Sequence, residues 1–247
     1  MKQNKMQFVD IHTHILPGVD DGAANMEQAL ELLRMSREDG IGAVVLTPHY
    51  RSRFRQNSPE RVMQSFEALC QEAHQRYPQM ELYLGSEVAY VRDVTEKLGD
   101  GTVLTLNDTH YVLLEFDTNC YRSRVIDGVL EVLNCGYVPI IAHVERYSIF
   151  RKKASLIDEV LDMGALIQLN ANSVMGKLGF GVKRYCHRLL KTHKVHFVAS
   201  DAHDTESRRP QLKACYERIA KKYGKSYAAA LFYENARAML AGEETIC

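Results

Sequence analysis

Short apolar runs that alternate with amphipathic stretches constrain the fold of this chain more than any other sequence feature. Each run is four to six residues long and rich in Val, Ile and Leu, which is typical of parallel strands covered on both faces. The seven runs are FVDI (8–11), AVVLT (43–47), LYLG (82–85), YVLLEF (111–116), VPIIA (138–142), ALIQLN (165–170) and HFVAS (196–200).

Helix signals lie between several of these runs. Asn25 is a suitable N-cap for a helix through Asp39, and Ser58-Pro59 opens another that runs to Arg76. Further helical patterns cover 123–135, 155–163, 183–192, 208–222 and 226–241. Strands and helices in this order predict an α/β fold, a single-domain distorted (β/α)7 barrel over residues 1–247. An open doubly wound sheet is the alternative.

Composition excludes several classes of protein. The hydrophobic share of 46% and the charged share of 25% are those of a globular chain, not of a disordered one. With 31 Lys+Arg against 31 Asp+Glu, the chain has no general attraction for nucleic acid or anionic lipid. No segment is apolar enough to span a membrane, and no signal peptide follows the basic N-terminal residues. We therefore expect a cytoplasmic protein with no nucleic-acid partner and no membrane insertion.

Histidines and carboxylates gather where the apolar runs end. In a parallel barrel all strand C-termini open on one face, so residues far apart in the sequence converge there. The spacing of His12 and His14 places both rings on the same side of an extended segment, and Asp201 and His203 repeat that spacing. The full set is His12, His14, His49, His143 and His203, with Asp10, Asp20, Asp21, Glu87, Glu115 and Asp201.

These residue types indicate a metal site. Imidazole with carboxylate is the ligand set of Mn²⁺, Zn²⁺ or Fe²⁺, and no cysteine lies at these strand ends. A single buried histidine is more often a hydrogen-bonded core residue. Glu115, however, lies in an apolar run, where a buried carboxylate is costly unless it is paired or binds metal. The joint pattern predicts a polynuclear site, and the histidines outside it are expected to be structural or solvated: His74, His110, His187, His193 and His196.

A cysteine-dependent mechanism is a competing interpretation. Cys70 and Arg76 have the six-residue separation of cysteine-dependent tyrosine phosphatases. That chemistry needs a loop whose N–H groups surround the phosphate and lower the pKa of the thiol. The segment has no glycine, and Phe66, Leu69, Cys70 and Ala73 have helical spacing. We therefore predict that Cys70 is a core residue and not a nucleophile.

Several strings of the sequence together resemble one family. DIHTHILPGVDDGA, LTPHY, GSE, LLEF, IAHVERY and SDAH occur in this order between about residue 8 and residue 210. They are similar to the polymerase-and-histidinol-phosphatase (PHP) superfamily. More narrowly, they resemble the metal-dependent protein-tyrosine phosphatases of bacterial capsule and exopolysaccharide loci, the CpsB/CapC group. DIHTHILPGVDDG and AHVERY are specific, whereas GSE or LLEF alone would be weak.

The resemblance implies a (β/α)7 barrel that holds three divalent metal ions, with Mn²⁺ expected and Fe²⁺, Zn²⁺ or Mg²⁺ as alternatives. Carried over residue by residue, the first metal takes His12, His14, Glu87 and Asp201. Glu87 bridges to the second, which also takes Glu115 and His143, and the third takes Asp21, His49 and His203. Glu115 stands where many PHP members have a histidine, which favours the tyrosine-phosphatase group. The segment RSRFR (51–55) receives no role.

Arginines near these residues are candidates to hold a phosphate, because a guanidinium fork fits two phosphate oxygens. Arg146 lies three residues past His143, in HVERY. Arg208 or Arg209, in ESRRP, follows His203. Of the three, Arg146 is the strongest candidate and Arg209 the weakest.

The resemblance also implies hydrolysis of phosphotyrosine in protein. The implied partner is a bacterial tyrosine kinase that phosphorylates its own tyrosine-rich tail and controls polysaccharide export. The metals would lower the pKa of water, so no phosphoenzyme is required. Two alternatives stay open: a PHP phosphatase of a small ester such as histidinol phosphate, and a metal-loaded module that binds phosphotyrosine without turnover. The neutral charge and the lack of a basic stripe disfavour a PHP nuclease.

Overall fold

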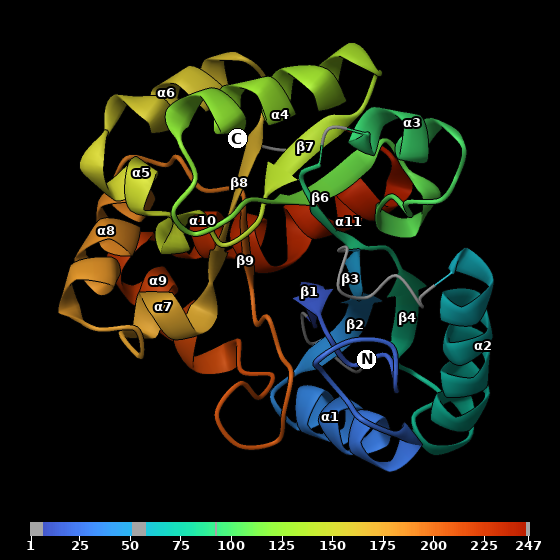
Figure 1. Cartoon of the computed structure of the whole chain (residues 1–247). Helices are drawn as coiled ribbons and strands as arrows, with labels where there is room; N and C mark the ends of the chain where they lie inside the picture. Colours follow the sequence, from blue (N-terminus) through green and yellow to red (C-terminus); the bar gives the residue numbers. More distant parts are fainter. Residues whose placement is uncertain (1–6, 51–57, 92, 246–247) are drawn as a thin grey trace.

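The strands form a curled parallel sheet surrounded by helices in the computed structural model, which describes residues 7–50, 58–91 and 93–245 (Figure 1). All the predicted apolar runs are strands, and each strand pairs in parallel with its neighbours. The strands are β1 (Phe8–Thr13), β2 (Ile41–Leu46), β3 (His49–Tyr50), β4 (Glu81–Leu84), β5 (Glu87–Ala89), β6 (Tyr111–Glu115), β7 (Val138–Ile141), β8 (Leu166–Asn170) and β9 (Phe197–Ala199).

Two of the predicted strands are interrupted, which the sequence pattern did not reveal. The second strand stops before Thr47-Pro48 and resumes as β3, and the third stops before Gly85 and resumes as β5. Pro48 has no N–H with which to continue a ladder. Gly85 lies so close to Leu106 that a Cβ at this position would come within 2.8 Å of the leucine side chain.

Both interrupted strands keep their direction across the break. The Gly85 N–H donates to the Leu46 carbonyl at 2.9 Å, and the Glu87 N–H donates to the Pro48 carbonyl at 3.1 Å. β3 then pairs with β5, and β5 pairs with β6. His49, expected just beyond a strand, therefore lies within β3, and Glu87 is the first residue of β5.

The sheet closes between its first and last strands. Thr13 at the end of β1 forms a parallel bridge with Ala202. The His14 N–H donates to the Ala202 carbonyl at 2.8 Å, and the Asp201 N–H donates to the His12 carbonyl at 2.9 Å. The sheet is therefore a closed, distorted barrel with seven strand positions, because β2 with β3 and β4 with β5 each form one interrupted strand. The open doubly wound alternative is wrong.

Helices occupy most of the predicted segments. The caps are as expected, since the Asn25 side chain accepts from the Gln28 N–H and the Ser58 hydroxyl accepts from the Arg61 N–H. No helix among the described residues combines the length and apolar character needed to cross a membrane. The helices are α1 (Met26–Glu38), α2 (Pro59–Arg76), α3 (Val94–Gly99), α4 (Arg122–Asn134), α5 (Ser148–Lys152), α6 (Ser155–Asp162), α7 (Ala171–Met175), α8 (Phe180–Lys191), α9 (Lys213–Tyr223), α10 (Lys225–Ala229) and α11 (Asn235–Ala241), with short helical turns η2 (Leu106–Asp108), η3 (Val144–Arg146) and η4 (Ala230–Glu234).

The helix predicted over 208–222 begins only at Lys213. A turn precedes it, in which the Asp204 carboxylate accepts backbone N–H groups of residues 206–208 at 2.6–3.0 Å. A side chain that satisfies backbone donors in this way competes with helix formation. The helix predicted over 226–241 is present, but it contains a π-helical turn, η4.

Apolar side chains fill the barrel toward the N-terminal ends of its strands. Val9, Leu113 and Phe197 belong to one cluster with Met239 of α11. Tyr111, the first residue of β6, donates its hydroxyl to a carbonyl of the segment after α11 at 2.7 Å. The C-terminal helix therefore covers this end, and the opposite end is left for polar side chains.

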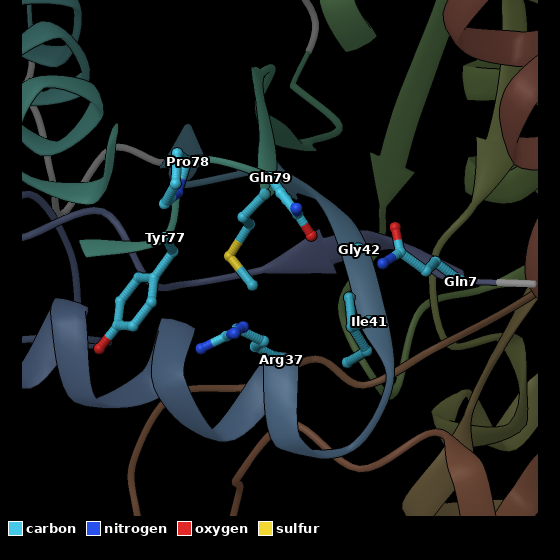
Figure 2. Close-up of a pocket in the computed structure, with 8 residues that line it drawn as sticks. Gln7, Arg37, Ile41, Gly42, Tyr77, Pro78 and Gln79 are labelled. Carbon is cyan, nitrogen blue, oxygen red and sulfur yellow. The ribbon is translucent and has the colours of Figure 1, made fainter. Parts of the chain in front are cut away.

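A small cavity of about 170 Å³ lies at the covered end of the barrel (Figure 2). Ile41 and Gly42 at the start of β2, Arg37 of α1 and Tyr77 after α2 contribute to its walls. Arg37 is the one charged residue among those that line it. This cavity therefore offers no ligand cluster comparable to that at the other end.

Candidate metal centre

Every residue of the predicted ligand sets lies at the carboxyl ends of the strands. These side chains are buried, except that of Asp21. They come from β1 and the segment after it (His12, His14), the loop before α1 (Asp21), β3 (His49), β5 (Glu87), the end of β6 (Glu115), the segment after β7 (His143) and the segment after β9 (Asp201, His203).

Most of the first predicted ligand set has the spacing of groups that share one ion. His12 Nε2 and His14 Nε2 are 3.2 Å apart. Glu87 oxygens lie 3.5 and 3.4 Å from these two nitrogens, and Asp201 Oδ1 lies 3.6 and 3.5 Å from them. Ligand atoms about 2.1 Å from one ion in tetrahedral geometry are about 3.4 Å apart. His12, His14 and Glu87 therefore lie close enough together to share one ion, whereas Asp201 groups with His12 and His143.

The second predicted set also meets at Glu87, at the Oε1 atom that faces His12. His143 Nε2 lies 2.7 Å from Glu87 Oε1 and 3.6 Å from Glu115 Oε1. Glu87 Oε2 lies 2.6 Å from His49 Nδ1, which was assigned to a different set. Glu87 is thus placed between groups, as a bridging carboxylate is.

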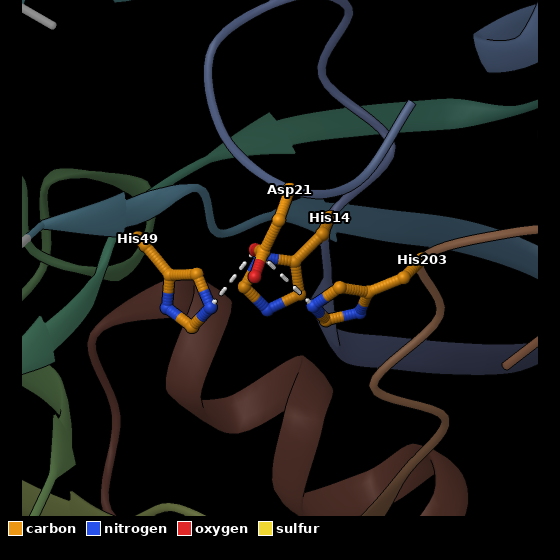
Figure 3. Close-up of side chains that lie close together, drawn as sticks. All are labelled: His14, Asp21, His49 and His203. Carbon is orange, nitrogen blue, oxygen red and sulfur yellow. Dashed lines mark ion pairs between the residues drawn. The ribbon is translucent and has the colours of Figure 1, made fainter. Parts of the chain in front are cut away.

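The third predicted set surrounds Asp21, which points toward two rings (Figure 3). Asp21 Oδ1 lies 3.3 Å from His49 Nε2 and 3.7 Å from His203 Nε2. The His14 ring stands beside them, with its centroid 3.8 Å from that of His203. His14 therefore borders two of the predicted sets, and the division of ligands among ions stays a prediction.

Hydrogen bonds outside the ligand groups orient two of the rings. His14 Nδ1 lies 2.6 Å from Asp20 Oδ2, and His12 Nδ1 lies 3.3 Å from the Gln168 side-chain oxygen. These acceptors favour the tautomers that carry hydrogen on Nδ1 and leave both Nε2 atoms free to bind metal. The same Gln168 oxygen accepts from the His143 N–H at 2.7 Å.

Gln168 and its neighbour Asn170 were missed in the sequence. The Asn170 side chain accepts from Gln168 at 2.9 Å and donates to Asp201 Oδ2 at 2.7 Å. Both residues lie in β8, whose run ALIQLN alternates apolar and polar residues at its end. That alternation was the available signal, since a polar side chain inside a covered strand requires a partner.

Burial and neighbouring charges oppose each other at the ligands. Burial would lower the pKa of His14, but Asp20 and Glu87 outweigh it and raise this pKa to about 10. Burial would raise the pKa of Asp20, but His14 lowers it to about 2. Burial dominates at His143 and lowers its pKa to about 4. At neutral pH His143 is therefore ready to bind metal, whereas His14 must first release a proton.

Two of the candidate arginines reach the ligands. Arg146 Nη1 lies 3.4 Å from Asp201 Oδ2, and Arg208 Nη2 lies 2.8 Å from Asp201 Oδ1. Both arginines line a cavity of about 640 Å³ together with Lys177. Arg146 also lines a second cavity, of about 370 Å³, beside Glu115.

The third candidate arginine and the cysteine motif lie elsewhere. Arg209 is exposed and does not line the larger cavity. Cys70 and Arg76 belong to the continuous helix α2. Burial, and to a smaller extent the charge of Glu67, raises the pKa of the Cys70 thiol. Cys70 is half-buried and not fully in the core as predicted. The basic segment 51–55 lies outside the described residues.

Replacement of the carboxylate behind His14 is expected to weaken metal binding. An amide at Asp20 has one oxygen, so it cannot accept both from the Gly22 N–H on one side and from His14 and the His49 N–H on the other. Asp20→Asn should lower Mn²⁺ affinity by about 10- to 100-fold. It should also lower the pKa of His14, so that fewer protons are released on Mn²⁺ binding near pH 7.5. Calorimetry in buffers of different ionisation enthalpy measures both effects.

The matched control is Asp158→Asn, which removes a carboxylate that pairs with Lys194 on the barrel exterior. This variant should bind Mn²⁺ as the unaltered protein does. Wild-type affinity and proton release in Asp20→Asn would contradict the role assigned to Asp20.

Comparisons with known proteins agree with this geometry. The family described as Capsular polysaccharide synthesis, CpsB/CapC matches residues 8–241. The chain is 33% identical over 238 residues to the tyrosine-protein phosphatase CpsB of Streptococcus pneumoniae, with 94% of this chain and 98% of that protein covered.

Solved structures give the same result. A chain from the crystal structures of YwqE from Bacillus subtilis and CpsB from Streptococcus pneumoniae, described as unique metal-dependent tyrosine phosphatases, matches with a TM-score of 0.91 at 30% identity, over 96% of each chain. The lactonase Lmo2620 from Listeria monocytogenes matches with a TM-score of 0.63 at 10% identity over 97% and 96% of the chains, a likeness of fold alone. The resemblance predicted from the sequence motifs is confirmed, and the chain belongs to the CpsB/CapC family of capsular polysaccharide synthesis proteins.

Proposed function

We infer that this chain is a metal-dependent tyrosine-protein phosphatase of the CpsB and YwqE type. The observation that carries this inference is the set of adjoining His, Glu and Asp groups at the strand ends that could each hold an ion, such as His12 with His14 and Glu87, and His12 with His143 and Asp201. Two arginines reach the same Asp201 carboxylate from an adjoining cavity. Similarity to CpsB over nearly the whole chain supports phosphotyrosine as the substrate.

The proposed centre holds three divalent ions, preferably Mn²⁺, in the ligand sets implied by the family motifs. His12, His14, Glu87 and Asp201 hold the first, Glu87, Glu115 and His143 the second, and Asp21, His49 and His203 the third. Bound metals of this kind neutralise phosphate charge and lower the pKa of water.

In this proposal the protein side chains position the phosphate. Arg146 and Arg208 extend over Asp201 toward the larger cavity and bind phosphate oxygens through their guanidinium forks. Asn170 fixes the Asp201 carboxylate from behind by its 2.7 Å hydrogen bond. The tyrosine oxygen that leaves has a pKa of about 10, so it needs less help from a proton donor than an alkoxide does.

The proposed protein substrate is the phosphotyrosine tail of an autophosphorylating bacterial tyrosine kinase that controls capsule or exopolysaccharide synthesis. Membership of a capsular polysaccharide synthesis family supports this choice. A flexible tail suits a centre that lies at the end of the barrel, beside an open cavity of about 640 Å³. Such a substrate places the enzyme in the cytoplasm.

Metal removal and thiol removal should have opposite results. Chelation with EDTA should abolish hydrolysis of a phosphotyrosine peptide, and added Mn²⁺ should restore it. Cys70→Ser should keep nearly full activity, because the thiol lies in a helix and its pKa is raised. Peptide and histidinol phosphate turnover are measured side by side with p-nitrophenyl phosphate. A Cys70→Ser protein that is folded and metal-loaded but inactive would refute the metal mechanism, and preferential hydrolysis of histidinol phosphate would refute the substrate.

Removal of Arg146 tests phosphate positioning separately from metal binding. Arg146→Ala should retain its metals and lower kcat by roughly 10²-fold, as loss of one preorganised donor does. Arg146→Lys should rescue only in part, because lysine lacks the fork. Arg209→Ala is the matched control, since this arginine does not line the cavity, and it should keep wild-type kinetics. If metal-replete Arg146→Ala also kept wild-type kinetics, Arg146 would have no part in the reaction.

A further inference from the structure

The neutral net charge conceals a strongly basic segment. Residues 171–200 contain no Asp or Glu, although the chain as a whole has as many acidic as basic residues. This segment follows β8 and includes α7 and α8, of which α8 lies beside α5 in Figure 1. Its cationic residues are Lys177, Lys183, Arg184, Arg188, Lys191 and Lys194. The balanced net charge of the chain therefore does not describe the charge of this segment.

Three arginines of this region line one pocket, here called the arginine pocket. Arg184 and Arg188 lie one turn apart on the same face of α8, and Arg151 comes from α5. Gly181 and Tyr185 complete the lining of this cavity of about 240 Å³. All three arginines are exposed to solvent.

The guanidinium groups of the arginine pocket are not neutralised by acidic neighbours. Arg184 and Arg188 form no ion pair with a carboxylate within the described ranges, whose ion pairs involve other residues. The Arg188 guanidinium stacks 5.0 Å from the centroid of the buried Tyr185 ring, which holds it in place. Arg151 donates to the carbonyl of Glu145. The pocket thus presents concentrated positive charge, and the first turn of α8 has no acidic side chain.

Two exposed apolar residues lie in the short sequence between the linings of the large cavity and the arginine pocket. Lys177 and Leu178 line the large cavity that Arg146 shares, and Gly181 lines the arginine pocket. Leu178 is 53% exposed, and Phe180, which precedes Gly181 in the sequence, is 79% exposed. Exposed apolar side chains beside cationic pockets indicate contact with a partner.

We propose that the arginine pocket binds a second phosphotyrosine of the same substrate polypeptide while the first is hydrolysed. This proposal rests on the phosphotyrosine phosphatase activity inferred above. Guanidinium forks fit the oxygens of a phosphate dianion, and the exposed ring of Phe180 offers an apolar contact for the chain between the two phosphates. A polypeptide bound at one phosphate presents the other at high effective concentration. The enzyme therefore prefers multiply phosphorylated segments.

Peptides with one and two phosphotyrosines, separated by several spacer lengths, test this preference. For the best spacer, KM should be about tenfold lower for the doubly phosphorylated peptide, as expected for one additional charge-assisted contact. Arg184→Glu/Arg188→Glu should abolish the difference between the peptides. It should leave hydrolysis of p-nitrophenyl phosphate unchanged, because the altered residues do not line the catalytic cavity. Circular dichroism and metal content establish that the variant is folded.

The matched control is Lys213→Glu/Lys221→Glu, which makes the same change of charge at exposed positions of α9. It should retain the preference for two phosphotyrosines. Arg184→Lys/Arg188→Lys should retain only part of it, since lysine keeps the charge and loses the fork.

Several outcomes would overturn the proposal. The first is equal KM values for the two peptides with the unaltered enzyme, and the second is a preference that survives in Arg184→Glu/Arg188→Glu. The third is an equal decrease in KM when glutamates replace the second phosphotyrosine. A decrease in the KM of the singly phosphorylated peptide on addition of free phosphotyrosine would also overturn it, because the pocket would then bind a separate anion. Failure of the unaltered enzyme to hydrolyse either peptide would instead refute the proposed function.

Discussion

Glu87 is the group on which the metal centre depends. Its side chain is fully buried, and four imidazoles face its two oxygens. Oε1 lies 2.7 Å from His143 and 3.5 Å from His12, and Oε2 lies 3.4 Å from His14 and 2.6 Å from His49. Burial would raise the pKa of Glu87, but these rings hold it well below the usual value. A charge withdrawn from water in this way persists only with compensation, which the rings and the proposed metals supply.

The irregular parts of the barrel bring these groups together. The break at Gly85 places Glu87 at the start of β5, and the break at Pro48 places His49 beside it, since β3 and β5 pair at these two residues. Closure of β1 against the segment after β9 brings His12 next to Asp201. His143 and Asp201 both have left-handed backbone conformations, with φ of 33° and 55°. Such conformations are uncommon for residues other than glycine and often occur at functional sites.

Regular features could be predicted from the sequence, and features made by tertiary contacts could not. Strands covered on both faces leave continuous apolar runs, so β6 and β7 were evident, and the ligands at strand ends followed from barrel geometry. The break between β4 and β5 lies where Gly85 approaches Leu106, a contact between distant segments. Gln168 was hidden in an apolar run, because its role depends on where His12 and His143 lie. The net charge of the chain did not reveal the basic surface of α8, because acidic residues elsewhere balance its lysines and arginines.

The central claim is that these side chains hold three metal ions around Glu87. The most direct measurement is a crystal structure of the Mn²⁺-loaded protein with anomalous difference maps recorded at the manganese edge. Three peaks are expected, with Glu87 oxygens within about 2.2 Å of two of them. One peak should also contact His12, His14 and Asp201, another Glu115 and His143, and the third Asp21, His49 and His203. A map without a peak bound by Glu87 would contradict the claim.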